Sequence, residues 1–150
     1  MRRMLSDFIQ NPETVCQIEA RIAAECAIAW LAAQKADSGQ KTRLCEAFTQ
    51  LETAGDTERR RAADSHFHRL LAEIAGNSIL SENSRTLMEQ LNEKSHDRIY
   101  RLDQVPRETD DQHWNIVVAV CANEPEAAEQ AMKRHMEYIY SLGLPEPEKN

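Results

Sequence analysis

The chain has 150 residues, of which 41% are hydrophobic and 29% are charged, with 4 Gly and 5 Pro. This composition is typical of one soluble globular domain that is long enough to bury a core. A formal net charge of −7 argues against the chain binding DNA or an anionic membrane by itself, because both need a surplus of Lys and Arg. The most apolar window, Ile22 to Ala33, contains Glu25 and is too short to span a bilayer, so no membrane association is expected.

The spacing of the cysteines and the first residues of the chain indicate the cellular compartment of the protein. The first residues, MRRMLSDFIQN, lack the apolar run of a signal peptide. The four cysteines form no CxxC pair and no tight cluster: Cys16, Cys26, Cys45 and Cys121. We therefore predict a cytoplasmic protein whose cysteines are reduced core residues.

Apolar residues recur at helical spacing along the chain, and no segment alternates with the two-residue period of a strand. The caps and breaks predict six helices: Pro12 to about Ala36, then, after a break at Asp37, Ser38 and Gly39, a helix to Gly55, and helices from Asp56 to Gly76, Ser78 to Arg101, Glu108 to Ala122 and Pro125 to Leu142. The predicted fold class is all-α, an antiparallel bundle of six helices, with Met4 to Ile9 as a candidate seventh. Residues 1–12 would be a leading segment or the remnant of an interdomain connector, 13–143 the domain, and 144–150 a frayed tail.

Three helices each place a histidine on their apolar face. Asp64 and His68 are four residues apart in the third helix, so their side chains share one side of it. His113 and His135 fall on the core stripes of the fifth and sixth helices, which are formed by Ile116, Val117, Val120, Ala128, Met132, Met136 and Ile139.

Two interpretations of these buried polar groups stay open on periodicity alone. A buried carboxylate is costly unless it is compensated, and a divalent cation would compensate Asp64 while using all three imidazoles. On the other hand, a single histidine on an apolar face is more often a core residue bonded to a neighbour. The remaining two histidines are expected at the surface, because His66 points away from Asp64 on a helix and His96 lies in a polar stretch.

The third helix carries the motif Asp64-Ser65-His66-Phe67-His68, which is followed by Ala75-Gly76-Asn77. Further matches, in order, are Arg21 with Glu25, His113 with Ile116 and Ala119, and Ala131-Met132 with His135-Met136. From about Val15 to Tyr138 the chain resembles the C-terminal ligand-sensing domain of FadR-type regulators in the GntR family, the FCD domain. It departs from that family at Gln112, where many members have Glu, and at Ala24, where Leu is usual.

The resemblance implies that Asp64, His68, His113 and His135 ligate one divalent cation. Such a ligand set suits zinc or nickel first, and also manganese, iron or cobalt, more than calcium. An octahedral metal would keep positions open for a small carboxylate effector, whereas a tetrahedral zinc would be purely structural. Arg21 is the candidate for a second contact to the carboxylate, and its alternative is a pair with Glu25 within the helix.

The implied function is that of a sensor domain, covering residues 13–143, in a homodimeric transcriptional regulator. DNA would be bound by an N-terminal winged helix-turn-helix that this chain does not contain. We predict that the chain is not an enzyme, because no separate general base stands in a recognisable motif. The alternatives are a metal-dependent hydrolase-like enzyme on a helical bundle and a helical interaction module with only a structural metal.

Overall fold

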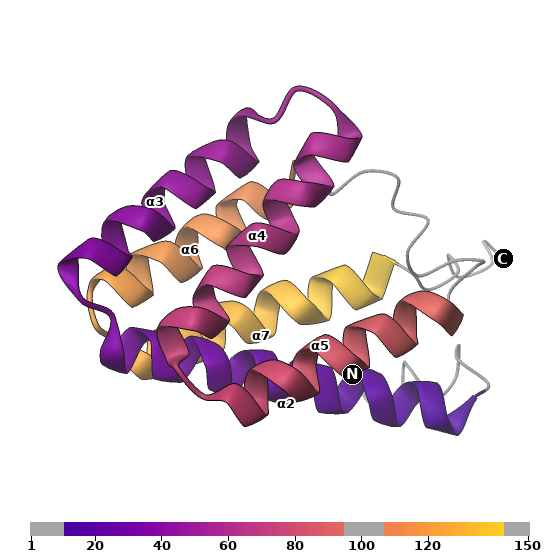
Figure 1. Ribbon diagram of the computed structural model, residues 1–150. Helices are drawn as coiled ribbons and strands as arrows, with labels where there is room; N and C mark the ends of the chain where they lie inside the picture. Colours follow the sequence, from indigo (N-terminus) through magenta and orange to yellow (C-terminus); the bar gives the residue numbers. More distant parts are fainter. Residues whose placement is uncertain (1–10, 95–106, 143–150) are drawn as a thin grey trace, which may run out of the picture.

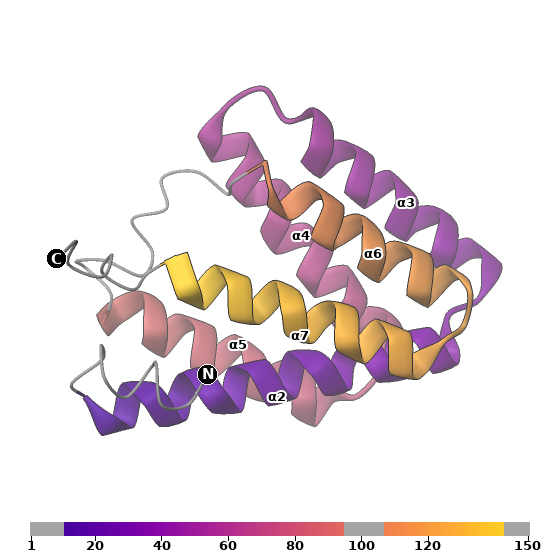
Figure 2. The ribbon, with the colours of Figure 1, turned by 180° about the vertical axis from the view of Figure 1, so that it is seen from behind.

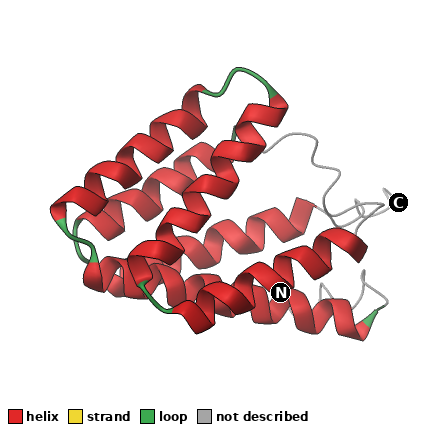
Figure 3. Cartoon of the chain, in the orientation of Figure 1, coloured by secondary structure: helices red, strands yellow, loops and turns green. Residues whose placement is uncertain are grey.

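The computed structural model describes residues 11–94 and 107–142, and these residues fold into helices without any strand (Figure 3). The six helices are α2 (Pro12–Lys35), α3 (Ser38–Thr53), α4 (Thr57–Ala75), α5 (Ser78–Lys94), α6 (Thr109–Cys121) and α7 (Pro125–Leu142). The predicted all-α fold class is confirmed.

Helix α2 is the helix against which most of the other described helices pack. It packs against α4, α5, α6 and α7, while α3 lies against α4 and α6 on the far side (Figures 1 and 2). Its predicted apolar stripe is buried throughout: Val15, Ile18, Ile22, Cys26, Ala29 and Ala33. Burying an aliphatic side chain such as Ile18 contributes about 1.5–3 kcal/mol, so this stripe supplies a large part of the folding free energy.

The ends of the helices follow the predicted capping residues, with one correction. Asp56 accepts a hydrogen bond from the backbone N–H of Arg59, and Gly76 ends α4 at φ 66°. The predicted break over residues 37–39 is wrong for Ser38 and Gly39, which form the first turn of α3. The reason is a capping box: Asp37 and Gln40 bond reciprocally to each other's backbone N–H, so the next helix starts without a loop.

Several predicted features lie outside the described residues. These are the candidate helix from Met4 to Ile9, the part of the fourth helix beyond Lys94, the surface position of His96, and the tail 144–150. The described part of that fourth helix, Ser78–Lys94, agrees with the prediction.

The prediction of core cysteines is only partly right. Cys26 is buried and Cys45 and Cys121 are half-buried, but Cys16 is exposed because it lies on the outer face of the first turns of α2. All four are free thiols. Among the described helices, none combines the length and the apolar character needed to cross a bilayer.

Asn123 joins the turn between α6 and α7 to the end of α2. Its side-chain amide donates to the carbonyls of Ala33 (2.9 Å) and Ala36 (3.3 Å), and its backbone has φ 53°. We expect Asn123→Ala to lower the free energy of unfolding by about 1–3 kcal/mol, because two carbonyls lose their donor and alanine is strained at positive φ. Urea unfolding measures this change. Asn115→Ala, at an exposed position of α6, is the matched control, and equal losses in the two variants would contradict the role of Asn123.

Candidate metal centre

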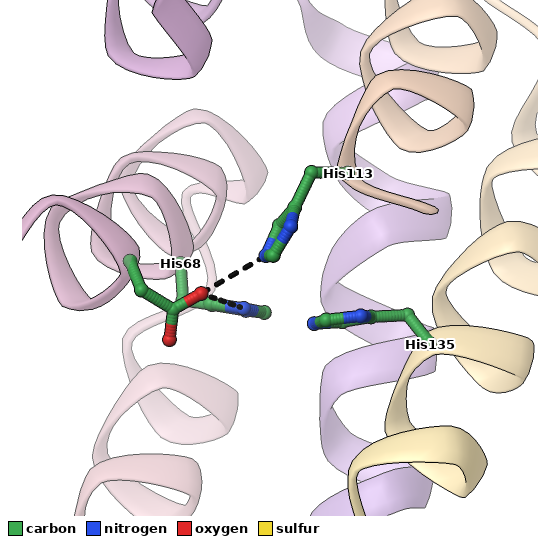
Figure 4. Close-up of side chains that lie close together, drawn as sticks. His68, His113 and His135 are labelled. Carbon is green, nitrogen blue, oxygen red and sulfur yellow. Dashed lines mark ion pairs between the residues drawn. The ribbon is translucent and has the colours of Figure 1, made fainter. Parts of the chain in front are cut away.

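The four predicted ligands come together in the interior of the bundle. Asp64 and His68 project from α4, His113 from α6 and His135 from α7, and one potential ligand atom from each lies within 4.8 Å of every other. Figure 4 shows the three imidazoles directed toward a common centre. The carboxylate Oδ1 of Asp64 is 2.9 Å from Nε2 of His113 and 3.7 Å from Nε2 of His68. We call these four residues the His–Asp cluster.

The cluster is enclosed on the side of α6 and α7 and more open on the side of α4. His113 and His135 are buried, at 0% and 2% exposure, whereas the side chains of His68 and Asp64 are 13% and 27% exposed. His66, which the helical spacing directs away from Asp64, is exposed as predicted.

Each of the three imidazoles has an acceptor close to its outer nitrogen. Nδ1 of His113 is 2.7 Å from the carbonyl oxygen of Thr109, and Nδ1 of His135 is 2.9 Å from Oε1 of Gln112. Nδ1 of His68 faces Oε2 of Glu25 at 3.5 Å. Each acceptor favours the tautomer with the proton on Nδ1, which leaves the Nε2 lone pair free to bind a cation. Metal-ligating histidines are usually held in this way.

A cation fits the unsatisfied atoms of the cluster. The buried Nε2 of His113 makes no hydrogen bond, although it lies 2.9 Å from the carboxylate of Asp64. An unsatisfied buried polar atom costs about 1–3 kcal/mol, and a shared metal ion would remove that cost. Ligand atoms that each lie about 2.1 Å from one metal are about 3–4.2 Å apart, so the more distant atoms of the cluster would have to move closer together when a metal binds. Three imidazoles with one carboxylate are a donor set suited to transition metals.

The electrostatics of the cluster favour the ionised form of Asp64 and the neutral form of His135. Burial would raise the pKa of Asp64, but His68 and His113 outweigh burial and hold that pKa well below its usual range. Burial, together with the charges of His113 and His68, keeps the pKa of His135 well below its ordinary value. Near neutral pH these two groups are therefore already in the states that bind a metal.

The pKa of His68 is shifted in the opposite direction to that of His135. Burial would lower its pKa, but the carboxylates of Asp64 and Glu25 outweigh burial and raise it. Burial likewise opposes ionisation of Glu25, yet His68 and Arg21 outweigh that effect, so the pKa of Glu25 is lowered. The hydroxyl of Ser84 donates to the other oxygen of Glu25. A cation that binds at His68 therefore competes with a proton for the imidazole.

A cavity of about 640 Å³ lies beside the cluster, between α2, α4 and α5. Asp64 and His68 line it, and so do Arg21 and Glu25 from α2. The guanidinium of Arg21, the predicted second contact for a carboxylate, is buried and donates from Nη1 to the hydroxyl of Tyr140 at 2.7 Å. The alternative interpretation of the sequence was a pair between Arg21 and Glu25, and the charge of Arg21 does act on Glu25. The two carboxylate oxygens of Glu25, however, contact Ser84 and His68. Arg21 is therefore placed both at the cavity and within reach of the charge on Glu25.

Sequence reasoning did not find the groups that orient the imidazoles. Gln112 and Glu25 attracted attention only as positions in a family pattern, and their contacts with His135 and His68 were not predicted. Thr109 acts through its backbone carbonyl, which no residue type signals. Helical spacing could reveal only the contact between Asp64 and His68, because these two residues are four positions apart on α4.

Known proteins match this chain over most of its length. The FCD domain family matches residues 17–138. The putative L-lactate dehydrogenase operon regulatory protein of Escherichia coli is 28% identical over 127 residues, which cover 83% of this chain and 49% of that protein. The HTH-type transcriptional repressor NanR of Cronobacter sakazakii is 28% identical over 148 residues, which cover 92% of this chain and 54% of the repressor. The chain spans about half the length of the curated relatives it matches.

These matches confirm the resemblance that the motifs of α4, α6 and α7 indicated. The family and the helical fold both agree with it. The chain belongs to the FCD domain family, the effector-binding domains of GntR-type transcriptional regulators.

Proposed function

We propose that this domain senses a small organic acid at a divalent transition metal held by the His–Asp cluster, and that it reports binding to a DNA-binding domain of the same regulator. The observation that carries the proposal is the convergence of three imidazoles and one carboxylate, of which Asp64 and His68 also line a cavity of about 640 Å³. A purely structural role would not need the space beside the cluster.

The metal would be held by Asp64, His68, His113 and His135. Zinc or nickel suits these ligands first, and manganese, iron or cobalt would also be accepted. In an octahedral shell four protein ligands would leave open positions. The exposure of Asp64 and His68 to the cavity supports binding of an effector on that side. A bound metal would supply Lewis-acid positions for an anionic oxygen of the effector.

The effector that suits this cavity is a small carboxylate. The buried guanidinium of Arg21 offers it a second contact, since guanidinium groups bind carboxylates by paired hydrogen bonds. Arg21 would also offset the repulsion between the effector and Glu25. Because the name of the Escherichia coli relative refers to an L-lactate dehydrogenase operon, hydroxy acids come first among the compounds to be tested.

The remaining parts of the proposal follow from the relatives. They are about twice as long as this chain, and one is named as an HTH-type repressor. We infer that DNA is contacted by an N-terminal winged helix-turn-helix, that the regulator is a cytoplasmic homodimer, and that the effector favours one arrangement of the helices over another. We propose no enzymatic activity, because the relatives are regulators.

A calorimetric titration of the metal-loaded protein with hydroxy and keto acids tests the sensor function. We expect one class of acid to bind, and we expect Arg21→Gln to weaken that binding about 10–100-fold, because hydrogen bonds to charged groups contribute about 1.5–3 kcal/mol. Tyr140→Phe removes the contact of Arg21 with the tyrosine hydroxyl but keeps the guanidinium, so it controls for mispositioning. Arg59→Gln, on the exposed side of α4, should bind like the unmodified protein.

The main rival of the sensor function is a metal with a structural role only, in which the four ligands close a tetrahedral shell. In that case the metal-loaded protein would bind none of the acids.

A further inference from the structure

The first turn of α6 is held in place by a buried arginine of α4. Arg60, which is 4% exposed, lies one helical turn before Asp64. Its guanidinium donates to the carbonyl of Leu51 at 2.8 Å and to the hydroxyl of Thr109 at 3.4 Å, and it forms an ion pair with Asp110 at 2.5 Å. One side chain thus ties the end of α3 and the start of α6 to α4.

This connection matters because the backbones of α4 and α6 do not approach each other closely. Both helices are described in full, and no Cα atom of one lies within 8 Å of a Cα atom of the other. Side chains fill the space between them. Asp64 reaches His113, and the ring of Phe67 packs edge-on against the same imidazole. Nearer the start of α6, Arg60 reaches Thr109 and Asp110. The distance between the two helices at the cluster therefore depends on these long side chains rather than on backbone packing.

The start of α6 has no side-chain cap of its own. Glu108 occupies the N-cap position without making a side-chain cap hydrogen bond. Arg60 holds the first turn from outside the helix, through Thr109 and Asp110. Arg107, just before the helix, donates instead to the carbonyls of Glu52 and Ala54 at the end of α3. Of these two arginines, Arg60 is the buried one and the one that contacts Thr109.

Thr109 links this turn to the cluster. Its side-chain hydroxyl accepts from Arg60, and its backbone carbonyl lies 2.7 Å from Nδ1 of His113. We propose that Arg60 is a positioning residue of the metal centre: it fixes the turn whose carbonyl orients His113, and so sets the distance between the Nε2 of His113 and the Asp64 carboxylate. Helix α4 would then supply both the ligand Asp64 and, through Arg60, the contact that positions the opposite ligand His113. This inference rests on the proposed metal site, but one of its tests needs no metal.

Metal affinity is the first test. We expect Arg60→Gln to weaken Co²⁺ binding about 10–100-fold and to alter the visible absorption of bound Co²⁺, because changes in the partners that orient metal ligands typically have effects of this size. Thr109→Val, which removes the hydroxyl but keeps the carbonyl, should act in the same direction with a smaller effect.

Arg107→Gln is the matched control, since Arg107 binds the same corner of the fold but does not contact Thr109. We expect it to change Co²⁺ affinity less than about 3-fold, a difference below 1 kcal/mol. If Arg60→Gln loses stability but keeps the Co²⁺ affinity and spectrum of the unmodified protein, Arg60 is merely structural and the inference is wrong. If Arg60→Gln does not fold, Arg60→Lys and Thr109→Val give the same readings.

The second test uses the metal-free protein. Long-range ¹H–¹⁵N correlation spectra of the imidazoles report which nitrogen carries the proton. We expect His113 to be protonated at Nδ1 in the unmodified protein and in Arg107→Gln, and to become a mixture of tautomers in Arg60→Gln, because its acceptor is no longer fixed. An unchanged tautomer in Arg60→Gln would overturn the inference. If the unmodified protein bound no metal, the proposed function would fail, and the tautomer would still decide the role of Arg60.

Discussion

Replacing His113 by alanine is expected to weaken the binding of Zn²⁺ or Co²⁺ by more than about 100-fold. Even partners that only orient a ligand typically cost 10–100-fold when they are removed, and His113 would be a ligand itself. It is also fully buried, so no water-filled surface offers a substitute donor on that side of the cluster. Competition with a chromophoric chelator measures the affinity.

His66→Ala is the control for that experiment. His66 lies on the same helix as two members of the cluster but is exposed, and we expect its removal to change metal affinity by less than about 3-fold. His113→Gln keeps most of the buried volume and separates loss of the ligand from loss of packing. If His113→Ala and His66→Ala bound metal equally well, His113 could not be a ligand.

Removal of the metal is expected to lower the melting temperature by about 8–16 °C. A ligand at about 1,000 times its Kd stabilises the folded state by about 4 kcal/mol, and each kcal/mol corresponds to about 2–4 °C for a chain of this length. Calorimetry before and after dialysis against a chelator measures the difference. Identical melting curves would mean that the cluster holds no metal in the folded protein.

This stabilisation by the metal should grow as the pH rises from 6 to 8. In the metal-free protein the raised pKa of His68 stabilises the fold below the ordinary histidine pKa of about 6.5, and that stability is lost as the pH rises through the raised value. In the metal-loaded protein protons compete with the cation for the same imidazole, so the sign is opposite. His135 contributes little to this trend, because its lowered pKa already keeps it neutral. A difference in melting temperature that did not change with pH would argue against a role for His68 as a ligand.

Local patterns determined much of the fold. Asp56, Gly76 and the apolar stripe of α2 act within one helix or at its end, so residue spacing predicted them. The Asp64–His68 pair was predictable for the same reason, since four residues are one helical turn. Ser38 and Gly39 misled because their composition suggests a loop, whereas the capping box of Asp37 makes them the start of a helix.

The orientation of the imidazoles was not predictable in this way. Gln112 and His135 are 23 residues apart, and Arg60 and Asp110 are 50 apart, so their contacts depend on how whole helices pack. The carbonyl of Thr109 is a backbone group, and any residue at that position would provide it. Periodicity could thus predict that the three histidines lie on inward faces. It could not predict the contacts that decide which ring nitrogen faces the centre of the cluster.

The cavity has a consequence for the mechanics of α5. This helix packs mainly against α2, and the space beside the His–Asp cluster separates much of it from α4. A molecule bound in the cavity would contact both α4 and α5. Helix α5 would then gain packing contacts on its second side, as core side chains provide elsewhere in the bundle. The backbone amides of Ser81, Ser84 and Met88 should then exchange with deuterium more slowly than in the ligand-free protein. The rigidity of α5 would thus depend on whether the cavity is occupied.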